Sequence, residues 1–291
     1  QGYMGFILIL PWLIGFCIFK LYPFVSSLIY SFTDYDLFKG VQNVVGFQNY
    51  IDAFTKPKNI KALQVTFTYA FMTVPLKLIF ALFIAYILNF RIKGVGLFRT
   101  AYYVPSILGG SVAIAVLWKA LFKNDGVVNT ILAMLGFESI NFLADKQWAL
   151  FIICLLRVWQ FGSAMVLFLA ALKGVPEDLY EAASIDGATR GRQFMSITIP
   201  LISPVIFYNL VTQLVQAFQE FNGPYIITNG GPRNATTLIS LIVYNTAFKD
   251  YKVGMSSAMA WVMFVIVMVL TIIAFVSQKK WVYYSDDDGR G

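Results

Sequence analysis

Six long apolar stretches alternate with shorter polar segments along the chain. A helix needs about 20 mainly apolar residues to cross the hydrocarbon core of a bilayer. The stretches cover residues of about 4–31, 63–90, 101–122, 148–172, 201–219 and 256–278. The first is over-long and holds Pro11 and Pro23, which favours a kinked or tilted helix. The pattern predicts an all-α fold, a polytopic membrane bundle of six transmembrane helices.

Composition supports this prediction and removes alternatives to it. The chain is 58% hydrophobic and 13% charged, whereas soluble domains carry about 25% charged residues. We find no soluble domain and no repeat, so residues 1–291 are predicted to form a single transmembrane domain. The first stretch lacks the charged start and cleavage site of a signal peptide. The absent initiator Met indicates that a short amino-terminal tail of unknown extent is missing.

The residue inventory also excludes much chemistry. The chain has no His, which excludes Ser-His-Asp and Cys-His nucleophiles and the usual zinc ligand sets. Cys17 and Cys154 lie in apolar runs and are expected to be buried as small hydrophobes. No phosphate-binding glycine loop occurs. We therefore expect no catalytic residue, no metal site and no cofactor on this chain, and interpret its net charge of +7 as membrane-surface charge.

Basic residues give the expected orientation. Lys and Arg are denser in residues 90–100, 173–199 and 278–291, which include Arg91, Lys93 and Arg290, than in the alternate connecting segments. Because cytoplasmic loops are enriched in Lys and Arg, both termini and the loop 173–199 are predicted to be cytoplasmic.

That loop is predicted to form two short helices. Pro176 suits a first helical turn, and Gly187 suits a left-handed stop. Thr189 can cap a second helix, which ends at Pro200 as the fifth stretch begins. By spacing alone, the loop could equally be an amphipathic connector on the membrane surface.

Its residues carry a family resemblance. Glu181-Ala182-Ala183, followed by Gly187, Ile197 and Ile199-Pro200, resembles the EAA loop of permease subunits in bacterial ABC importers, E-A-A-x3-G-x9-I-x-L-P, with Ile199 in place of Leu. Asp186, the segment 46–54 and Gly230-Gly231-Pro232 are similar to the maltose-type, carbohydrate-uptake group of these permeases. The resemblance spans about residues 3–283.

The resemblance implies a fold, a mechanism and partners. It implies a type I ABC importer permease in the bacterial inner membrane, whose loop 173–200 docks on an ATP-binding subunit and couples ATP hydrolysis to transport. The implied partners are a homologous second permease in a heterodimer, two ATP-binding subunits that carry ATP and Mg, an extracytoplasmic solute-binding protein and a carbohydrate. The coupling residues would be Glu181, Ala182, Ala183, Asp186, Gly187, Ile197 and Pro200.

Two basic residues lie inside predicted spans, where a charge costs about 2.5–3.5 kcal/mol. No acidic residue lies in the same or adjacent spans, so Lys77 and Arg157 are expected to be unpaired. Lys77 could extend its side chain to the membrane surface, or it could hydrogen-bond to the end of a helix that is broken near Pro75. The alternative hypothesis is that both cations favour an anionic sugar.

Polar residues also form a stripe along the fifth span. Steps of three and four place them on one helical face, which suits either helix–helix hydrogen bonds or sugar hydroxyls. Trp159 could stack on a sugar ring or simply pack in the bundle. The candidate substrate-pathway residues are Lys77, Arg157, Trp159, Gln160, Asn209, Gln213, Gln216, Gln219 and Glu220.

One outer turn is a candidate docking site, and two other functions compete with that of an importer subunit. Gly230, Gly231 and Pro232 are either a binding-protein docking site or a surface turn. The rival to an importer subunit is a self-sufficient secondary transporter or channel for a small polar solute, although we find no inverted repeat or paired acidic site. An intramembrane enzyme is disfavoured by the missing His. The sequence names neither the sugar nor the helices that line its path.

Overall fold

The computed structural model describes residues 2–41, 43–90 and 94–284, with side chains from Leu8 onward. Arg91, Lys93 and Arg290, which entered the predicted orientation, lie outside these ranges. The chain divides into two compact units. The first contains residues up to Leu63 together with Ile239–Ile266, and the second contains Gln64–Leu238 and the residues from Val267. The prediction of a single domain stays a prediction.

The first unit begins with a long helix. Helix α1 (Gly2–Phe16), a π-helical segment (Cys17–Leu21) and α2 (Tyr22–Tyr30) follow one another without a break. The apolar helix Leu8–Ser31 is long enough to span a membrane, and its most apolar 18-residue window has no residue buried within the chain. Cys17 is accordingly exposed, so the expectation that it is buried was wrong, whereas Cys154 is buried. An apolar helix that is mostly uncovered by its own chain requires lipid or another subunit around it.

Four other helices build the core of this unit. They are α3 (Gln48–Thr55), the first turns of α4 (Pro57–Asn89), α13 (Ile239–Phe248) and the first part of α14 (Val253–Gln278). The Trp261 ring lies 4.6 Å from that of Phe24, and its Nε1 donates to Ser27 Oγ at 3.1 Å. These contacts hold α2 against α14. The buried core residues are Ala53, Ala62, Ile239, Ile242, Met259 and Val262.

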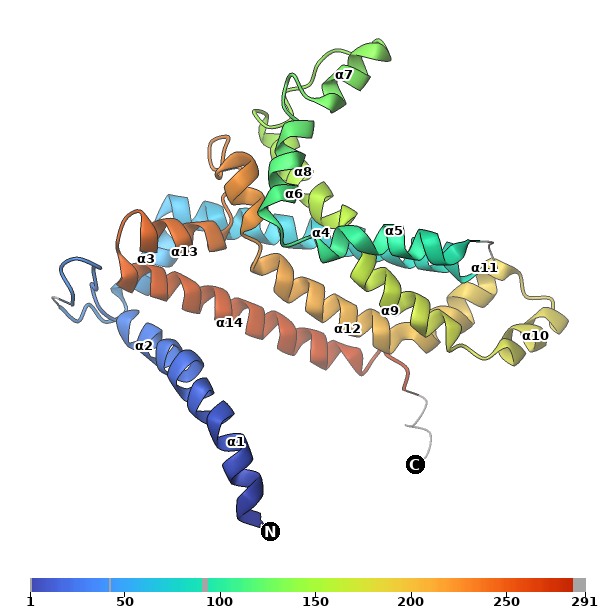
Figure 1. Ribbon diagram of the computed structural model, residues 1–291, viewed down its shortest axis with the longest axis horizontal. Coiled ribbons are helices and arrows are strands. Elements are labelled where there is room, and N and C mark those ends of the chain that lie inside the picture. Colours follow the sequence, from blue (N-terminus) through green and yellow to red (C-terminus); the bar gives the residue numbers. More distant parts are fainter. Residues whose placement is uncertain (1, 42, 91–93, 285–291) are drawn as a thin grey trace. The chain divides into compact units, whose positions relative to one another are not determined.

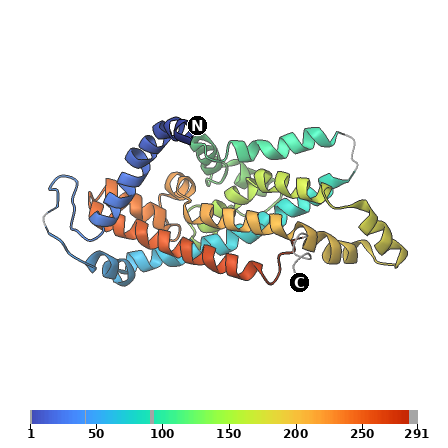
Figure 2. The same cartoon turned by 90° about the horizontal axis from the view of Figure 1, so that it is seen from below.

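The second unit contains the remaining helices. In it, α9 packs against α5 and α12, and Figure 2 shows α5 running beside α9. The end of the chain returns to α12, where Tyr283 N donates to Ser203 Oγ at 2.8 Å. After α4, the helices are α5 (Val95–Ile107), α6 (Val112–Leu121), α7 (Val127–Met134), α8 (Lys146–Trp159), α9 (Gly162–Lys173), α10 (Glu177–Ile185), α11 (Arg190–Gln193) and α12 (Ile199–Phe218), with π-helical segments at Phe194–Thr198 and Pro224–Thr228.

The third predicted span is not one straight helix. It is the pair α5 and α6, which meet at an angle of 100° (Figure 1). Gly109 and Gly110 lie at the corner, and Ser111 starts α6 as an N-cap that accepts a hydrogen bond from Ala113 N. A glycine pair favours a sharp kink, and an N-cap of this kind starts a new helix. The predicted span over 101–122 therefore contains a sharp bend, and it counts as one span only as a bent pair.

The fourth and fifth predicted spans agree more closely with the helices of the structure. The fourth is the pair α8 and α9, bent by 44°. The fifth starts earlier than predicted, because α11 and its π-helical segment run directly into α12 and make one helix over Arg190–Phe218. Four described helices are individually long and apolar enough to cross a membrane, and the number rises to 6 if each bent pair is one span.

Candidate functional site

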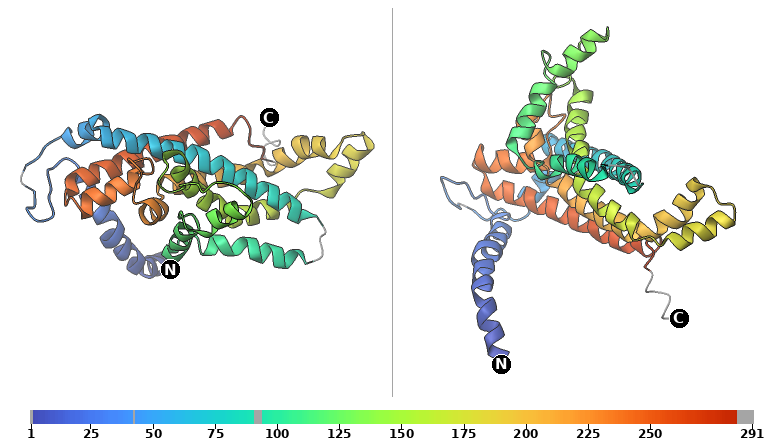
Figure 3. Two further views of the ribbon diagram at one scale, coloured as in Figure 1. Left: turned by 90° about the horizontal axis from the view of Figure 1, so that it is seen from above. Right: turned by 45° about the vertical axis from the view of Figure 1, so that its right-hand side comes forward.

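The segment 176–200 forms a helical hairpin. Figures 1 and 3 show α10 and α11 as this hairpin, joined to the ends of α9 and α12. Helix α10 begins at Glu177 with Glu177 and Asp178 in its first turn, next to the positive end of the helix dipole. Thr189 caps α11 by accepting a hydrogen bond from Arg192 N. The first predicted short helix is therefore confirmed, whereas the second does not end at Pro200 but continues into α12.

The turn between the two helices has a Schellman geometry. Ala188 N donates to Ala183 O at 2.9 Å, and Gly187 N donates to Ser184 O at 3.1 Å, the two bonds that close this motif. Gly187 has a φ of 76°, a left-handed conformation that favours glycine. A Cβ added there would meet nothing within 4 Å. Backbone conformation alone therefore requires the glycine.

This turn supplies a first prediction. Asn tolerates the left-handed conformation, whereas other L-residues pay about 1–2 kcal/mol there. We expect Gly187→Val to lower uptake several-fold because it loosens the hairpin, and Gly187→Asn to transport close to the wild-type rate. Uptake by cells with matched membrane levels of each variant measures this. Equal rates for the two variants would contradict a role for the turn geometry.

One side chain that sequence analysis missed ties the hairpin together. Gln193 Nε2 donates to Ser184 Oγ at 2.9 Å and to the Ala188 carbonyl at 3.3 Å. The Tyr180 hydroxyl shares a 2.8 Å hydrogen bond with Thr198 Oγ1. These bonds join α10 to the helix that continues as α12. No periodicity or motif marks Gln193, because its partners are set by the folded turn.

The hairpin divides its predicted coupling residues between two faces. Ala183, Ile197 and Pro200 are half-buried, whereas Glu181, Ala182, Asp186 and Gly187 are exposed. Ile185, which sequence analysis did not single out, is 86% exposed at the end of α10. The outer face thus offers small and apolar groups together with carboxylates that can accept charge-assisted hydrogen bonds.

The charged residues predicted inside the spans have partners. Arg157 Nε lies 2.6 Å from Glu220 Oε2, and Arg157 Nη1 donates to Gln160 Oε1 at 2.8 Å. The expectation that Arg157 is unpaired was wrong. Glu220 lies just beyond the end of α12, in a connecting turn, and its other oxygen accepts from Gly223 N at 3.0 Å.

The other side chains of the polar stripe on α12 are partly buried and partly exposed. Lys77 Nζ donates to Gln213 Oε1 at 2.7 Å, with both residues buried. Asn209 is buried and donates to the Val205 carbonyl of its own helix, whereas Gln216 and Gln219 are exposed. Helix–helix hydrogen bonding therefore accounts for the Lys77–Gln213 part of the stripe.

Little space is left among these side chains. A hollow of about 10 Å³ lies between Lys77, Arg157, Gln213 and Gln216, which is room for about one water molecule. A sugar ring does not fit there in this conformation. Trp159 is 36% exposed, and its ring lies 5.6 Å from that of Trp118.

The predicted outer docking turn is folded inward. Gly230 is buried, and its carbonyl accepts from Thr237 Oγ1 at 3.0 Å. The Gly231 carbonyl accepts from Thr236 Oγ1 at 2.7 Å. Gly231 and Pro232, joined by a cis peptide bond, are half-buried. The exposed side chains of this turn belong to Asn229, Arg233 and Asn234.

Known proteins resemble this chain over nearly its whole length. It is 46% identical to the probable ABC transporter permease protein YesP of Bacillus subtilis, over 98% of this chain and 93% of that protein. It is 34% identical to the trehalose/maltose transport system permease protein MalF of Thermococcus litoralis, over 94% and 92%. It is 35% identical to the sn-glycerol-3-phosphate transport system permease protein UgpA of Yersinia pestis, over 97% and 96%.

Structure comparison and a family model agree with these relatives. A chain of a bacterial alginate ABC transporter, crystallised with a pentasaccharide-bound periplasmic protein, superposes with a TM-score of 0.82 at 23% identity, over 96% of this chain and 94% of that chain. At that identity the likeness shows the fold. The model for binding-protein-dependent transport system inner membrane components matches residues 53–281. The chain belongs to this family of multi-pass inner membrane proteins, as a permease of the ABC transporter type.

Proposed function

We propose that this chain is one of two homologous permease subunits in an ATP-driven importer. ATP and Mg bind on two separate ATP-binding subunits, and this chain performs no catalysis. The observation that carries the proposal is the capped hairpin, with Glu181, Ala182 and Asp186 exposed on its outer face. A hairpin tied by Gln193 transmits force better than a flexible loop, because it moves as a unit.

Co-purification tests this assignment. We expect an ATP-binding subunit to migrate with the tagged chain after gentle extraction from its native membrane, and uptake in proteoliposomes to require ATP. Deleting the hairpin residues 177–193 should release that subunit. Uptake by the chain alone, driven by an ion gradient, would instead support a secondary transporter.

The proposed solute is a sugar or oligosaccharide delivered by an extracytoplasmic binding protein. Two considerations support it: the trehalose/maltose relative is similar along nearly the whole chain, and the amides of Gln213 and Gln216 can bond hydroxyl groups. Because the hollow between them is about 10 Å³, a sugar would enter only after α4, α8 and α12 separate. The homologous subunit would supply the other wall.

The charge of the sugar is a finer part of the proposal. Glu220 offsets Arg157, so Lys77 is the cation left to favour an acidic group. One charge at about 4 Å in a wet pathway contributes about 1 kcal/mol, or fivefold in affinity. We therefore expect an acidic oligosaccharide to compete for uptake about fivefold better than a neutral one of equal size. Equal competition would remove the acidic substrate from the proposal.

The proposed orientation places both chain termini and the α10–α11 hairpin in the cytoplasm. The outer turn 229–234 then faces the binding protein. Since Gly230 is buried and its neighbours are half-buried, we propose that the glycines and Pro232 shape the turn, and that Asn229, Arg233 and Asn234 make the contact.

A further inference from the structure

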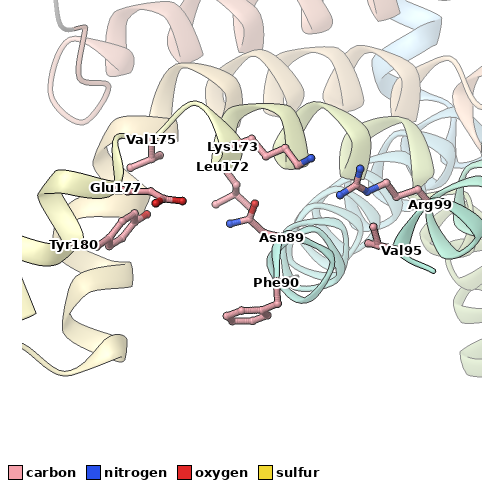
Figure 4. A pocket seen from close by; sticks show the side chains of 9 residues that line it. All are labelled: Asn89, Phe90, Val95, Arg99, Leu172, Lys173, Val175, Glu177 and Tyr180. Carbon is pink, nitrogen blue, oxygen red and sulfur yellow. The ribbon is translucent and has the colours of Figure 1, made fainter. Parts of the chain in front are cut away.

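A second pocket lies at the foot of the coupling hairpin. It has a volume of about 510 Å³, and the ends of α4 and α9 and the starts of α5 and α10 surround it (Figure 4). We call it the basal pocket and define it by Asn89, Arg99, Lys173, Glu177 and Tyr180. It shares no residue with the polar cluster around Arg157.

Two cations form one wall of the basal pocket. Figure 4 shows the Arg99 and Lys173 side chains reaching into the same space from α5 and α9. Among the described residues, neither forms a salt bridge. Arg99 Nη2 donates to the Leu88 carbonyl at 3.4 Å, and its Nε is buried without a hydrogen-bond partner. Buried donors normally have hydrogen-bond partners, so Arg99 Nε can donate a hydrogen bond to a ligand in the pocket.

The opposite wall carries one carboxylate. Glu177 lies beside Tyr180 across the pocket from the cations, and the Asn89 amide lies between the two walls (Figure 4). Two cations and one carboxylate leave a net positive pocket. Guanidinium and ammonium groups together bind phosphate oxygens well, and the wall that bears Arg99 and Lys173 is the place for such a group.

The rim of the basal pocket is apolar. Phe90, which is 47% exposed, and Val95 are apolar residues that line it beside Arg99. Basic pockets between membrane helices at the cytoplasmic side bind lipid headgroups. A soluble phosphate would contact the cations and leave the apolar rim exposed. A phospholipid would contact the cations with its headgroup and the apolar rim with its acyl chains.

We propose that the basal pocket binds an anionic phospholipid, with its phosphate on Arg99 and Lys173 and its acyl chains over the rim. The proposal rests on the membrane location of the family and on the proposed cytoplasmic side of the hairpin. It is independent of which solute is transported. It places a lipid in contact with the start of α10, where Glu177 begins the coupling helix.

Native mass spectrometry of the intact detergent-purified complex tests the proposal, with phosphatidylglycerol titrated as the probe. Each of Arg99→Gln and Lys173→Gln should weaken binding about fivefold, since a cation near a lipid surface contributes about that factor. Glu177→Gln should tighten binding, because it removes a repelling charge from the same pocket. Lys280→Gln, which removes an exposed cation outside the pocket, should leave binding unchanged.

Three outcomes would overturn the proposal. One is equal affinity of wild type and Lys173→Gln, and another is weakening by Lys280→Gln as large as that by Lys173→Gln. The third is full displacement of phosphatidylglycerol by inorganic phosphate, which would make the ligand a soluble anion. Should Lys173→Gln fail to fold, Lys173→Arg must keep the affinity and Glu177→Gln must raise it. Uptake does not enter this test, so its result is separate from that of the proposed function.

Discussion

Replacing Glu181 by Lys is expected to abolish coupled uptake while the protein stays in the membrane. The side chain is exposed on the outer face of α10, so the fold does not need it. Reversing its charge would set like charges against each other in the proposed contact with the ATP-binding subunit. Such a juxtaposition costs several kcal/mol, or about a hundredfold in binding. Uptake and ATP hydrolysis by reconstituted complexes measure the effect together.

The matched control for this variant is Glu138→Lys. Glu138 is also exposed, and it precedes α8 in a segment predicted to lie on the other side of the membrane. The Glu138→Lys substitution changes the net charge by the same amount as Glu181→Lys, and the Glu138→Lys variant should transport normally. Wild-type uptake by Glu181→Lys, or equal loss in both variants, would contradict the coupling role of α10.

Removing the Arg157 guanidinium is expected to destabilise the second unit. Arg157→Met takes the cation away from the Glu220 carboxylate, whose side chain is 7% exposed against 23% for Arg157. Breaking a buried ion pair from one side costs about 3–5 kcal/mol, and the partial exposure of Arg157 places the cost near about 3 kcal/mol. Thermal unfolding of the purified protein in detergent should shift down accordingly.

The double variant Arg157→Met with Glu220→Gln is the test of mechanism. It removes the buried charge as well as its cation and keeps an oxygen for the Gly223 N–H. We expect it to recover most of the lost stability, because replacing both ions can be nearly neutral. If the double variant is as unstable as the single one, the pair does not act through its charges.

The coupling hairpin could be predicted from sequence because its determinants are local. The cap at Thr189 and the left-handed Gly187 each act within one turn of the chain, and short-range patterns report such interactions. The apolar length of each span was also visible, since burial in lipid needs only composition. Residues that act beyond a few positions, such as Gln193, left no pattern.

Two features depend on long-range packing and were not predicted from the sequence. An apolar run has the same hydropathy whether its helix is straight or turns by 100°, so the corner at Gly109 and Gly110 could not be read from it. The Arg157–Glu220 pair forms because the chain turns after α12 and returns to the end of α8. Sequence separation within and between spans does not reveal that a carboxylate in a connecting turn lies beside Arg157.

The corner between α5 and α6 is held mainly by segments that lie later in the chain. Ser106 Oγ donates to the Gln160 carbonyl at 3.0 Å and accepts from Ser163 N, while Asn222 Nδ2 donates to the Gly110 carbonyl at 3.2 Å. A Cβ on Gly162 would collide with the Tyr102 backbone. We therefore expect the corner between α5 and α6 to move together with α8 and α9 in any tilt of those two helices.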